Sequence, residues 1–358
     1  MHTKTTIGIG LGAAILSAGL FATTGQAREL KLSDQFPTQH TITAEGTKAF
    51  FDHIAAHPEV DLTVKHFPAG QLGKPNAQMD LVKDRVADIA LVGISYVPEK
   101  LPLSTMMELP EAYKNSFEGY AAITSLLMNE LNEREFAPAG IKPLWAVVTP
   151  QYQLLLTRKD PITDISDLKG TKTRVAGSTA ELVASALGLV PVRMPAPDLY
   201  VALERGTLDA AIYSLSVLQS YKLEEVTQSY TSNAALGGVS FVAFINSGVW
   251  NSLTPEQQKV VTEASDAAGF ATVCALVKNE TKTIDTLNGM GKTVYELDAK
   301  LQGQFAEALV KVSDEWRQGM DSRGVPGSDI LKRFDELRAE LTANGTVDAA
   351  IRKCAETK

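Results

Sequence analysis

Cysteine and histidine are scarce in this sequence, whose 358 residues include two cysteines and five histidines. No close Cys/His spacing typical of a structural zinc site is apparent, so we expect no bound metal. Signatures of common enzymes are missing as well. The stretch GISYV, residues 93–97, lacks the second glycine of a nucleophile elbow, and neither HExxH, nor a P-loop, nor GxGxxG opens a helix. We therefore expect neither a cofactor nor an enzymatic activity.

Positive charge is in deficit, because 34 Lys and Arg residues stand against 42 Asp and Glu residues, a formal net charge of −8. An acidic protein is repelled by the phosphates of nucleic acids and of anionic lipids. The sequence therefore argues against a nucleic-acid partner and against binding to a membrane surface.

The first 27 residues have the pattern of a secretory signal peptide. They contain one lysine, an apolar run over residues 7–20, and the small-residue end Gly25-Gln26-Ala27. This pattern predicts cleavage after Ala27 and export to the periplasm. A membrane anchor is the alternative, but the run is shorter than the span of about 20 apolar residues that a bilayer requires. No later segment is expected to cross a membrane.

The two cysteines, Cys274 and Cys354, would meet an oxidising compartment after export. They could form one disulfide that ties the C-terminal tail to a helix. The alternative is two unpaired thiols, one on a helix face and one in the tail.

Strand-like and helix-like patterns alternate along the chain. In the N-terminal part, alternating and 3.6-residue hydrophobic patterns predict strands at 28–36, 60–68 and 87–93, and helices at 44–57 and near 76–85. This order is typical of an α/β fold with mostly parallel sheets flanked by helices. The chain without its leader is longer than one core usually holds, so we expect two domains.

A similar pattern recurs in the second half. Ser178 and Glu181 form a predicted capping box, and Gly188 follows the end of that helix. Strands are then predicted at LVPVRM and TLDAAIY, residues 189–194 and 207–213.

One predicted helix is unusually long. Thr254, Pro255 and Gln257 form a strong helix start, and no clear stop occurs before Gly289. A helix of this length extends about 50 Å at 1.5 Å per residue, which is more than the width of one small domain. We expect it to bridge both domains, the alternative being a break near Gly269.

Arg174 lies at the end of a predicted strand and just before a predicted helix start, in TKTRVAGSTAE. Ligands of open α/β sheets bind at the carboxyl ends of the strands. The planar guanidinium can bind a carboxylate with two parallel hydrogen bonds, and a helix N-terminus also favours an anion. The alternatives are an ion pair with an acid such as Asp167, or a solvated side chain.

Several motifs resemble one known family. DLKGTKTRVAGS (167–178), VKHFPAGQLG (64–73) and LTPEQQKVVTEA (253–264) occur in the order found in solute receptors of TRAP transporters, the DctP-like family. The resemblance implies a monomeric, two-lobed periplasmic binding protein that closes on a small organic acid and delivers it to the integral membrane subunits. It also implies that the arginine at position 174 binds the ligand carboxylate.

The resemblance also implies how the chain divides between the lobes. Lobe I is expected to contain residues 28–150 and about 238–275. Lobe II is expected to contain residues 151–237 and about 276–358.

Departures from the family pattern bear on the ligand. Leu154 stands where some members carry a second arginine, Ile212 and Tyr213 replace polar residues, and Ala196 replaces an aromatic. Losing polar partners disfavours a polyhydroxylated sugar acid, because each buried unpaired hydroxyl costs about 1–3 kcal/mol. We expect a monocarboxylate with an apolar or aromatic body, on which Tyr213 would stack, unless this tyrosine is a core residue.

Further candidate ligand-binding residues are His40, Gln35, Tyr96, Gln153 and Trp145. His40 precedes a predicted helix and could equally be exposed, and Trp145 could equally belong to the core. An exported enzyme with His40 as base and Arg174 as orienting group is an alternative function. A receptor for an ATP-driven importer or a sensor is another.

Overall fold

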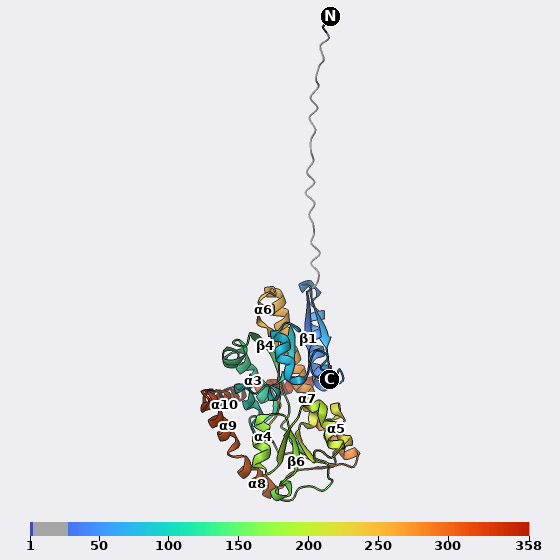
Figure 1. Ribbon diagram of the computed structural model, residues 1–358, viewed down its shortest axis with the longest axis vertical. Helices are drawn as coiled ribbons and strands as arrows, with labels where there is room; N and C mark the ends of the chain where they lie inside the picture. Colours follow the sequence, from blue (N-terminus) through green and yellow to red (C-terminus); the bar gives the residue numbers. More distant parts are fainter. Residues whose placement is uncertain (3–27, 358) are drawn as a thin grey trace.

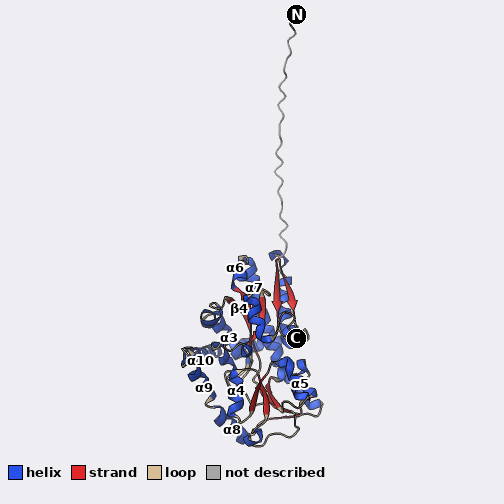
Figure 2. Ribbon diagram, in the orientation of Figure 1, coloured by secondary structure: helices blue, strands red, loops and turns tan. Residues whose placement is uncertain are grey.

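The computed structural model describes residues 1–2 and 28–357, so the predicted cleavage after Ala27 lies outside the described residues. The described chain forms two α/β lobes, each built on its own sheet (Figures 1 and 2). The first contains β1 and β4, and the second contains β6 and α5. The predicted two-lobed fold is therefore confirmed.

The sheet of the first lobe has the order β2-β1-β3-β10-β4. β1 pairs in parallel with β2 and β3, whereas β10 is antiparallel to β3 and β4. All residues of β3 and β10 are buried, as expected of strands covered on both faces. The bounds are β1 (Arg28–Ser33), β2 (Leu62–Phe67), β3 (Ile89–Gly93), β4 (Ile141–Val148) and β10 (Ser240–Asn246).

The sheet of the second lobe has the order β11-β9-β5-β8-β6-β7. β6 is parallel to β7 and β8, and β5 is antiparallel to β8 and β9. β5 is the first strand after the chain enters the second lobe, and β10 is the first strand after the chain returns to the first lobe. Both are antiparallel to their neighbours. The bounds are β5 (Gln153–Leu156), β6 (Lys172–Val175), β7 (Val190–Arg193), β8 (Ala210–Tyr213), β9 (Ser229–Thr231) and β11 (Thr293–Tyr295).

Helices cover both sheets. In the order of the chain they are α1 (Lys48–Ala55), α2 (Gln78–Lys83), α3 (Ser116–Met128), α4 (Ser178–Ala186), α5 (Leu199–Glu204), α6 (Ser247–Asn251), α7 (Pro255–Gly289), α8 (Ala299–Leu309), α9 (Val312–Asp321), α10 (Gly327–Ala343) and α11 (Thr346–Glu356). The predicted capping box at the start of α4 is wrong. Gly177 occupies the N-cap position without a side-chain cap, and Ser178 is the first helical residue.

The long helix α7 bridges the lobes as predicted. Thr254 and Gln257 form a reciprocal capping box, and the helix continues through Gly269, where the hydroxyl of Tyr120 leaves no room for a side chain. α7 contacts α1 and β4 of the first lobe, and β11 and the segment Leu215–Tyr221 of the second. By length and composition alone α7 could cross a membrane, contrary to our expectation. These contacts are those of a core helix.

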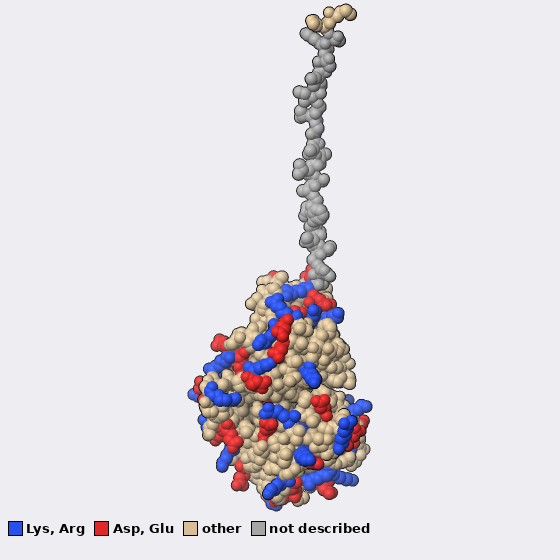
Figure 3. Space-filling model, viewed as in Figure 1, with Lys and Arg blue, Asp and Glu red and all other residues tan. Residues whose placement is uncertain are grey.

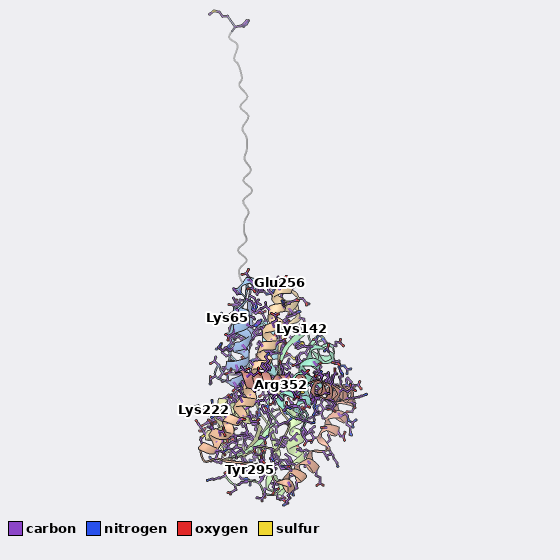
Figure 4. All side chains as sticks on the ribbon, turned by 180° about the vertical axis from the view of Figure 1, so that it is seen from behind. Lys65, Lys142, Lys222, Glu256, Tyr295 and Arg352 are labelled. Atoms are coloured by element: carbon purple, nitrogen blue, oxygen red, sulfur yellow. A yellow bond between two sulfur atoms is a disulfide. The ribbon has the colours of Figure 1, made fainter. Side chains whose placement is uncertain are left out.

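The C-terminal helices are shared between the lobes. α8 and α9 contact α4, but α10 and α11 pack on α3 of the first lobe, where Arg338 lies 3.4 Å from Glu118. The assignment of all of 276–358 to lobe II therefore does not match this packing. Seen from behind, Arg352 of α11 lies between Lys142 of the first lobe and Tyr295 of the second (Figure 4). This tail joins both lobes on their outer face.

Cys274 of α7 and Cys354 of α11 form a disulfide, the first of the two alternatives that the sequence left open. Both cysteines are buried in a small cluster with Phe117, Val273 and Val347. The disulfide therefore ties the C-terminal helix to the bridging helix.

Candidate functional site

Arg174 is the third residue of β6 and is almost fully buried, with 1% of its surface exposed. Its Nε donates to the carbonyl of Met194 (2.9 Å) and its Nη1 to the carbonyl of Ile212 (3.4 Å). Its Nη2 donates to the hydroxyl of Tyr96 across the two lobes (3.5 Å), and its guanidinium lies 5.4 Å from the ring centre of Tyr213. Neutral groups therefore hold this buried cation in place.

No carboxylate forms an ion pair with Arg174 within residues 28–357. Asp167, one alternative partner, instead accepts from the backbone of Thr163 and Asp164. Burial raises the pKa of nearby Glu108 to about 8, although its hydrogen bond with Ser95 and the charge of Arg174 oppose this rise. Glu108 is thus mostly neutral at pH 7, and it leaves the charge of Arg174 largely uncompensated.

Arg174 lines a narrow cavity whose interior volume is only about 20 Å³. This is room for about one water molecule, so an organic acid can enter only when the lobes open or the side chains of the wall move. Its wall is largely aromatic and comes from both lobes: Phe36, Tyr96, Tyr152, Tyr213, Tyr221 and Phe241. A wider groove shares Gln35 and Tyr96 with the cavity and contains residues of both lobes. Thus the cavity lies between the lobes, beside an open cleft.

The structure brings five of the predicted site residues together. Arg174, Tyr213, His40, Tyr96 and Gln35 all line this cavity. His40 is buried rather than exposed, and burial lowers its pKa to about 3, so its imidazole is neutral at pH 7. Among residues 28–357, Arg174 is the one charged side chain in the cavity wall.

The two other predicted site residues do not line the cavity. The side-chain oxygen of Gln153 accepts from the hydroxyl of Thr231 (3.0 Å) and from the backbone N–H of Ala234 (2.9 Å). It therefore fastens β5 to the last residue of β9 and to the segment that follows. Trp145 of β4 packs on the ring of Phe50 at 4.9 Å in the first lobe, which is the core placement that the sequence left open.

Sequence reasoning missed four aromatic residues of the wall: Phe36, Tyr152, Tyr221 and Phe241. Phe36 follows Gln35, and Tyr152 precedes Gln153, so each lies next to a residue that was considered. Nothing in the local pattern singles out Tyr221, which ends a short helical segment after β8. Its place in the wall is set by the packing of that segment on α7.

A possible cation site lies elsewhere. One ligand atom from each of His53, His57 and Glu263 falls within 4.8 Å of the others, a grouping that the search for zinc-type Cys/His spacing did not identify. The signal was the spacing of four residues between the histidines, which puts them on one side of a helix turn. None of these three residues lines the cavity.

Charged side chains are intermixed on the visible face of the molecule, where Figure 3 shows Lys and Arg beside Asp and Glu over both lobes. Such a surface lacks the one-sign stripe by which proteins bind nucleic acids. The positive charge available to an anionic ligand in the cavity is that of the buried Arg174.

Two lobes enclosing a cavity with a buried, unpaired cation define a solute-binding receptor of the periplasmic type. The chain belongs to the family described as bacterial extracellular solute-binding protein, family 7 (DctP), whose model matches residues 33–318. This match confirms the resemblance found in the sequence.

Known relatives cover nearly the whole chain. The 2,3-diketo-L-gulonate-binding periplasmic protein YiaO of Escherichia coli is 25% identical over 91% of this chain and 98% of its own. A marine metagenome TRAP solute-binding protein, solved with 3-hydroxybenzoate, superposes with a TM-score of 0.81 at 23% identity, covering 88% of this chain and 99% of its own. A TRAP solute-binding protein of Rhodoferax ferrireducens with copurified benzoate gives a TM-score of 0.79 at 23% identity, covering 89% and 99%.

Proposed function

We propose that this chain is the extracytoplasmic receptor of a TRAP-type transporter and that it binds a small monocarboxylate with an apolar or aromatic body. The observation that carries the proposal is a buried arginine without an acidic partner in the wall of a small aromatic cavity. A buried charge of this kind is costly unless a counter-charge reaches it. The carboxylate of a ligand supplies that counter-charge.

The geometry of Arg174 suits one carboxylate. Three of the five guanidinium N–H groups donate to Met194, Ile212 and Tyr96, so two remain for a ligand. A bidentate guanidinium–carboxylate pair in a buried site is both stronger and more directional than a neutral hydrogen bond. The carbonyls of Met194 and Ile212 keep the guanidinium in this orientation before the ligand arrives.

Closure of the lobes completes the site. The Tyr96 hydroxyl of the first lobe contacts both Arg174 and the backbone N–H of Ala196 in the second lobe (3.3 Å). A ligand that touches both lobes stabilises the closed form relative to the open form, which is a population shift rather than chemistry. The closed receptor then delivers its ligand to the integral membrane subunits. We also propose export by cleavage after Ala27 and a monomeric receptor.

The aromatic wall favours the proposed ligand class. Rings of six aromatic residues surround the cavity and offer faces and edges to an apolar body. Two structural neighbours hold 3-hydroxybenzoate and benzoate. Another, from Sulfitobacter, holds β-D-galacturonate, with a TM-score of 0.74 at 18% identity. A sugar acid of that kind would present a polar ring with several hydroxyls to a wall that is largely aromatic.

An enzyme with His40 as base has little support. The Nδ1 of His40 accepts from the backbone N–H of Ile42 (3.2 Å), and its low pKa makes the imidazole a weak base. We infer that the protein binds its ligand without converting it. Mass spectrometry of the ligand after incubation with the protein should show no change.

Calorimetric titration with benzoate, phenylacetate and galacturonate tests the ligand class. We expect one of the two aromatic monocarboxylates to bind and galacturonate to bind more weakly or not at all. Arg174→Met should weaken binding by about 2–5 kcal/mol, or roughly 30- to 4000-fold, because it removes the charge partner. Arg158→Met, at an exposed arginine of the same lobe, is the control and should bind normally. Near-normal affinity in Arg174→Met would refute the proposal.

A further inference from the structure

His40 has one free donor in the cavity wall. Its Nδ1 accepts a hydrogen bond from the N–H of Ile42, so the single proton of the neutral ring is on Nε2. That Nε2 is buried and has no hydrogen-bond partner among the described residues. The ring is held in this position by Phe36, at 4.3 Å between ring centres. A buried donor left unpaired costs about 1–3 kcal/mol, so its presence calls for an acceptor.

Tyr221 brings a second unpaired group to the same place from the other lobe. Its hydroxyl is buried without a hydrogen-bond partner among the described residues, and its ring meets that of His40 edge-on at 5.4 Å. The side-chain amide of Gln35 also lines the cavity, and both its Nε2 and its Oε1 are buried and unpaired. Four unpaired polar atoms therefore belong to three residues of one wall.

From this placement we infer that the natural ligand carries, besides its carboxylate, a second uncharged oxygen that accepts hydrogen bonds from His40 Nε2 and the Tyr221 hydroxyl. This inference rests on the proposed function. A hydroxyl satisfies the wall best, since it can accept from His40 and donate to the Oε1 of Gln35. The ligand class is then a hydroxy- or oxo-substituted aromatic monocarboxylate.

A second carboxylate does not fit this wall. His40 is neutral, and in the part of the chain that the structure describes no cation other than Arg174 lines the cavity. A second buried carboxylate would lose its hydration without gaining a counter-charge, which is far more costly than burying a neutral hydroxyl. Dicarboxylates should therefore bind more weakly than the matching hydroxy acids.

The second oxygen also links recognition to closure. His40 belongs to the first lobe and Tyr221 to the second, so their donors meet only when the lobes are closed. A ligand that satisfies both favours the closed form over an open form in which water reaches these groups. An unsubstituted acid lacks this contribution.

Matched ligand pairs test the inference. The probes are benzoate with its three monohydroxy isomers, phenylacetate with its three monohydroxy isomers, and isophthalate, titrated into the wild-type protein by calorimetry. We expect at least one hydroxylated isomer to bind roughly 10-fold tighter than its parent acid, because it pairs groups that otherwise stay unpaired. Isophthalate should bind more weakly than benzoate.

Two variants test whether His40 and Tyr221 cause the preference for a hydroxylated isomer. In Tyr221→Phe and in His40→Phe the ratio between the affinities for the hydroxylated isomer and for its parent acid should fall toward one, whatever the affinity for the parent acid becomes. Tyr230→Phe is the control: its hydroxyl is buried and bonded to Thr227, and it does not line the cavity. Thermal unfolding of each variant checks that it folds. Because Tyr221→Phe removes a single oxygen, it remains informative if His40→Phe is unstable.

The outcomes separate the two proposals. If the parent acids bind as well as or better than every hydroxylated isomer, the inferred second oxygen is wrong and the receptor proposal stands. If no monocarboxylate binds, both the inferred second oxygen and the proposed ligand class are wrong. The preference should also stay constant from pH 5.5 to 7, because a neutral His40 does not titrate there. A preference that changes steeply across this range would contradict the assigned proton on Nε2.

Discussion

Replacing Gly177 by alanine should oppose closure of the lobes. Gly177 lies between β6 and α4 of the second lobe and faces Ser95 of the first. An added Cβ would lie 2.6 Å from the carbonyl oxygen of Ser95 and 3.0 Å from its Cα. These are backbone atoms, so relief requires the lobes to move apart. The φ of Gly177 is −157°, an extended conformation that alanine adopts without strain.

The magnitude follows from the cost of overpacking. Forcing an extra methyl group into a tight contact costs about 1–3 kcal/mol. This cost raises the free energy of the closed form and leaves that of the open form unchanged. Because ligand affinity includes the free energy of closure, we expect Gly177→Ala to bind its ligand about 5- to 150-fold more weakly. Alanine is also a poorer N-cap than glycine, so the free energy of unfolding should fall by a smaller amount in both forms.

Calorimetry measures the affinity, and small-angle X-ray scattering with and without ligand measures closure. Gly303→Ala is the matched control, since a Cβ at this position of α8 meets no atom within 4 Å. We expect normal binding in the control and, in Gly177→Ala, a larger radius of gyration at ligand concentrations that close the wild type. Unchanged affinity and unchanged compaction in Gly177→Ala would refute the closure argument.

Two further predictions concern pH and the disulfide. Glu108 has a pKa raised by burial to about 8, so its protonated form contributes stability that is complete below pH 4.5 and lost as the pH rises through 8. The free energy of unfolding, from urea titrations, should fall more between pH 5 and pH 9 in the wild type than in Glu108→Gln, and equal slopes would contradict this. Ligand affinity should also fall above pH 8 in the wild type alone, because an ionised Glu108 competes for Arg174. Replacing Cys274 and Cys354 by serine removes a cross-link of sequence separation 80. This should lower the free energy of unfolding by about 4 kcal/mol without changing the affinity for the ligand. A large loss of affinity would show that the C-terminal tail acts on the binding site.

Local signals were sufficient where one segment decides its own structure. The capping box at Thr254 and the absence of a stop signal predicted α7 almost to the residue. The apolar runs of β3 and β8 predicted buried strands. Arg174 stood out because it lies at the end of a predicted strand and just before a predicted helix start, where ligands of open α/β sheets bind. The family motifs added the two-lobed arrangement, which periodicity cannot supply.

Local signals failed where a distant segment decides. Gly177 rather than Ser178 occupies the N-cap position of α4, and the close approach of Ser95 leaves no room for a side chain at Gly177. Gln153 was a plausible ligand contact until its side chain proved to fasten Thr231. Tyr221 joins the wall only through the packing of its segment on α7.

The sequence by itself determined the α/β class, the bridging helix, the family and the candidate arginine, because hydrophobic period, caps and motifs are short-range properties of the chain. The tertiary structure alone decided which polar groups meet at the cavity and which of them lack partners. Pairing depends on side chains from both lobes, which are far apart in the sequence and come within reach of one another only when the two sheets face across the cleft. The unpaired donors of His40 and Tyr221 are therefore a property of the closed fold.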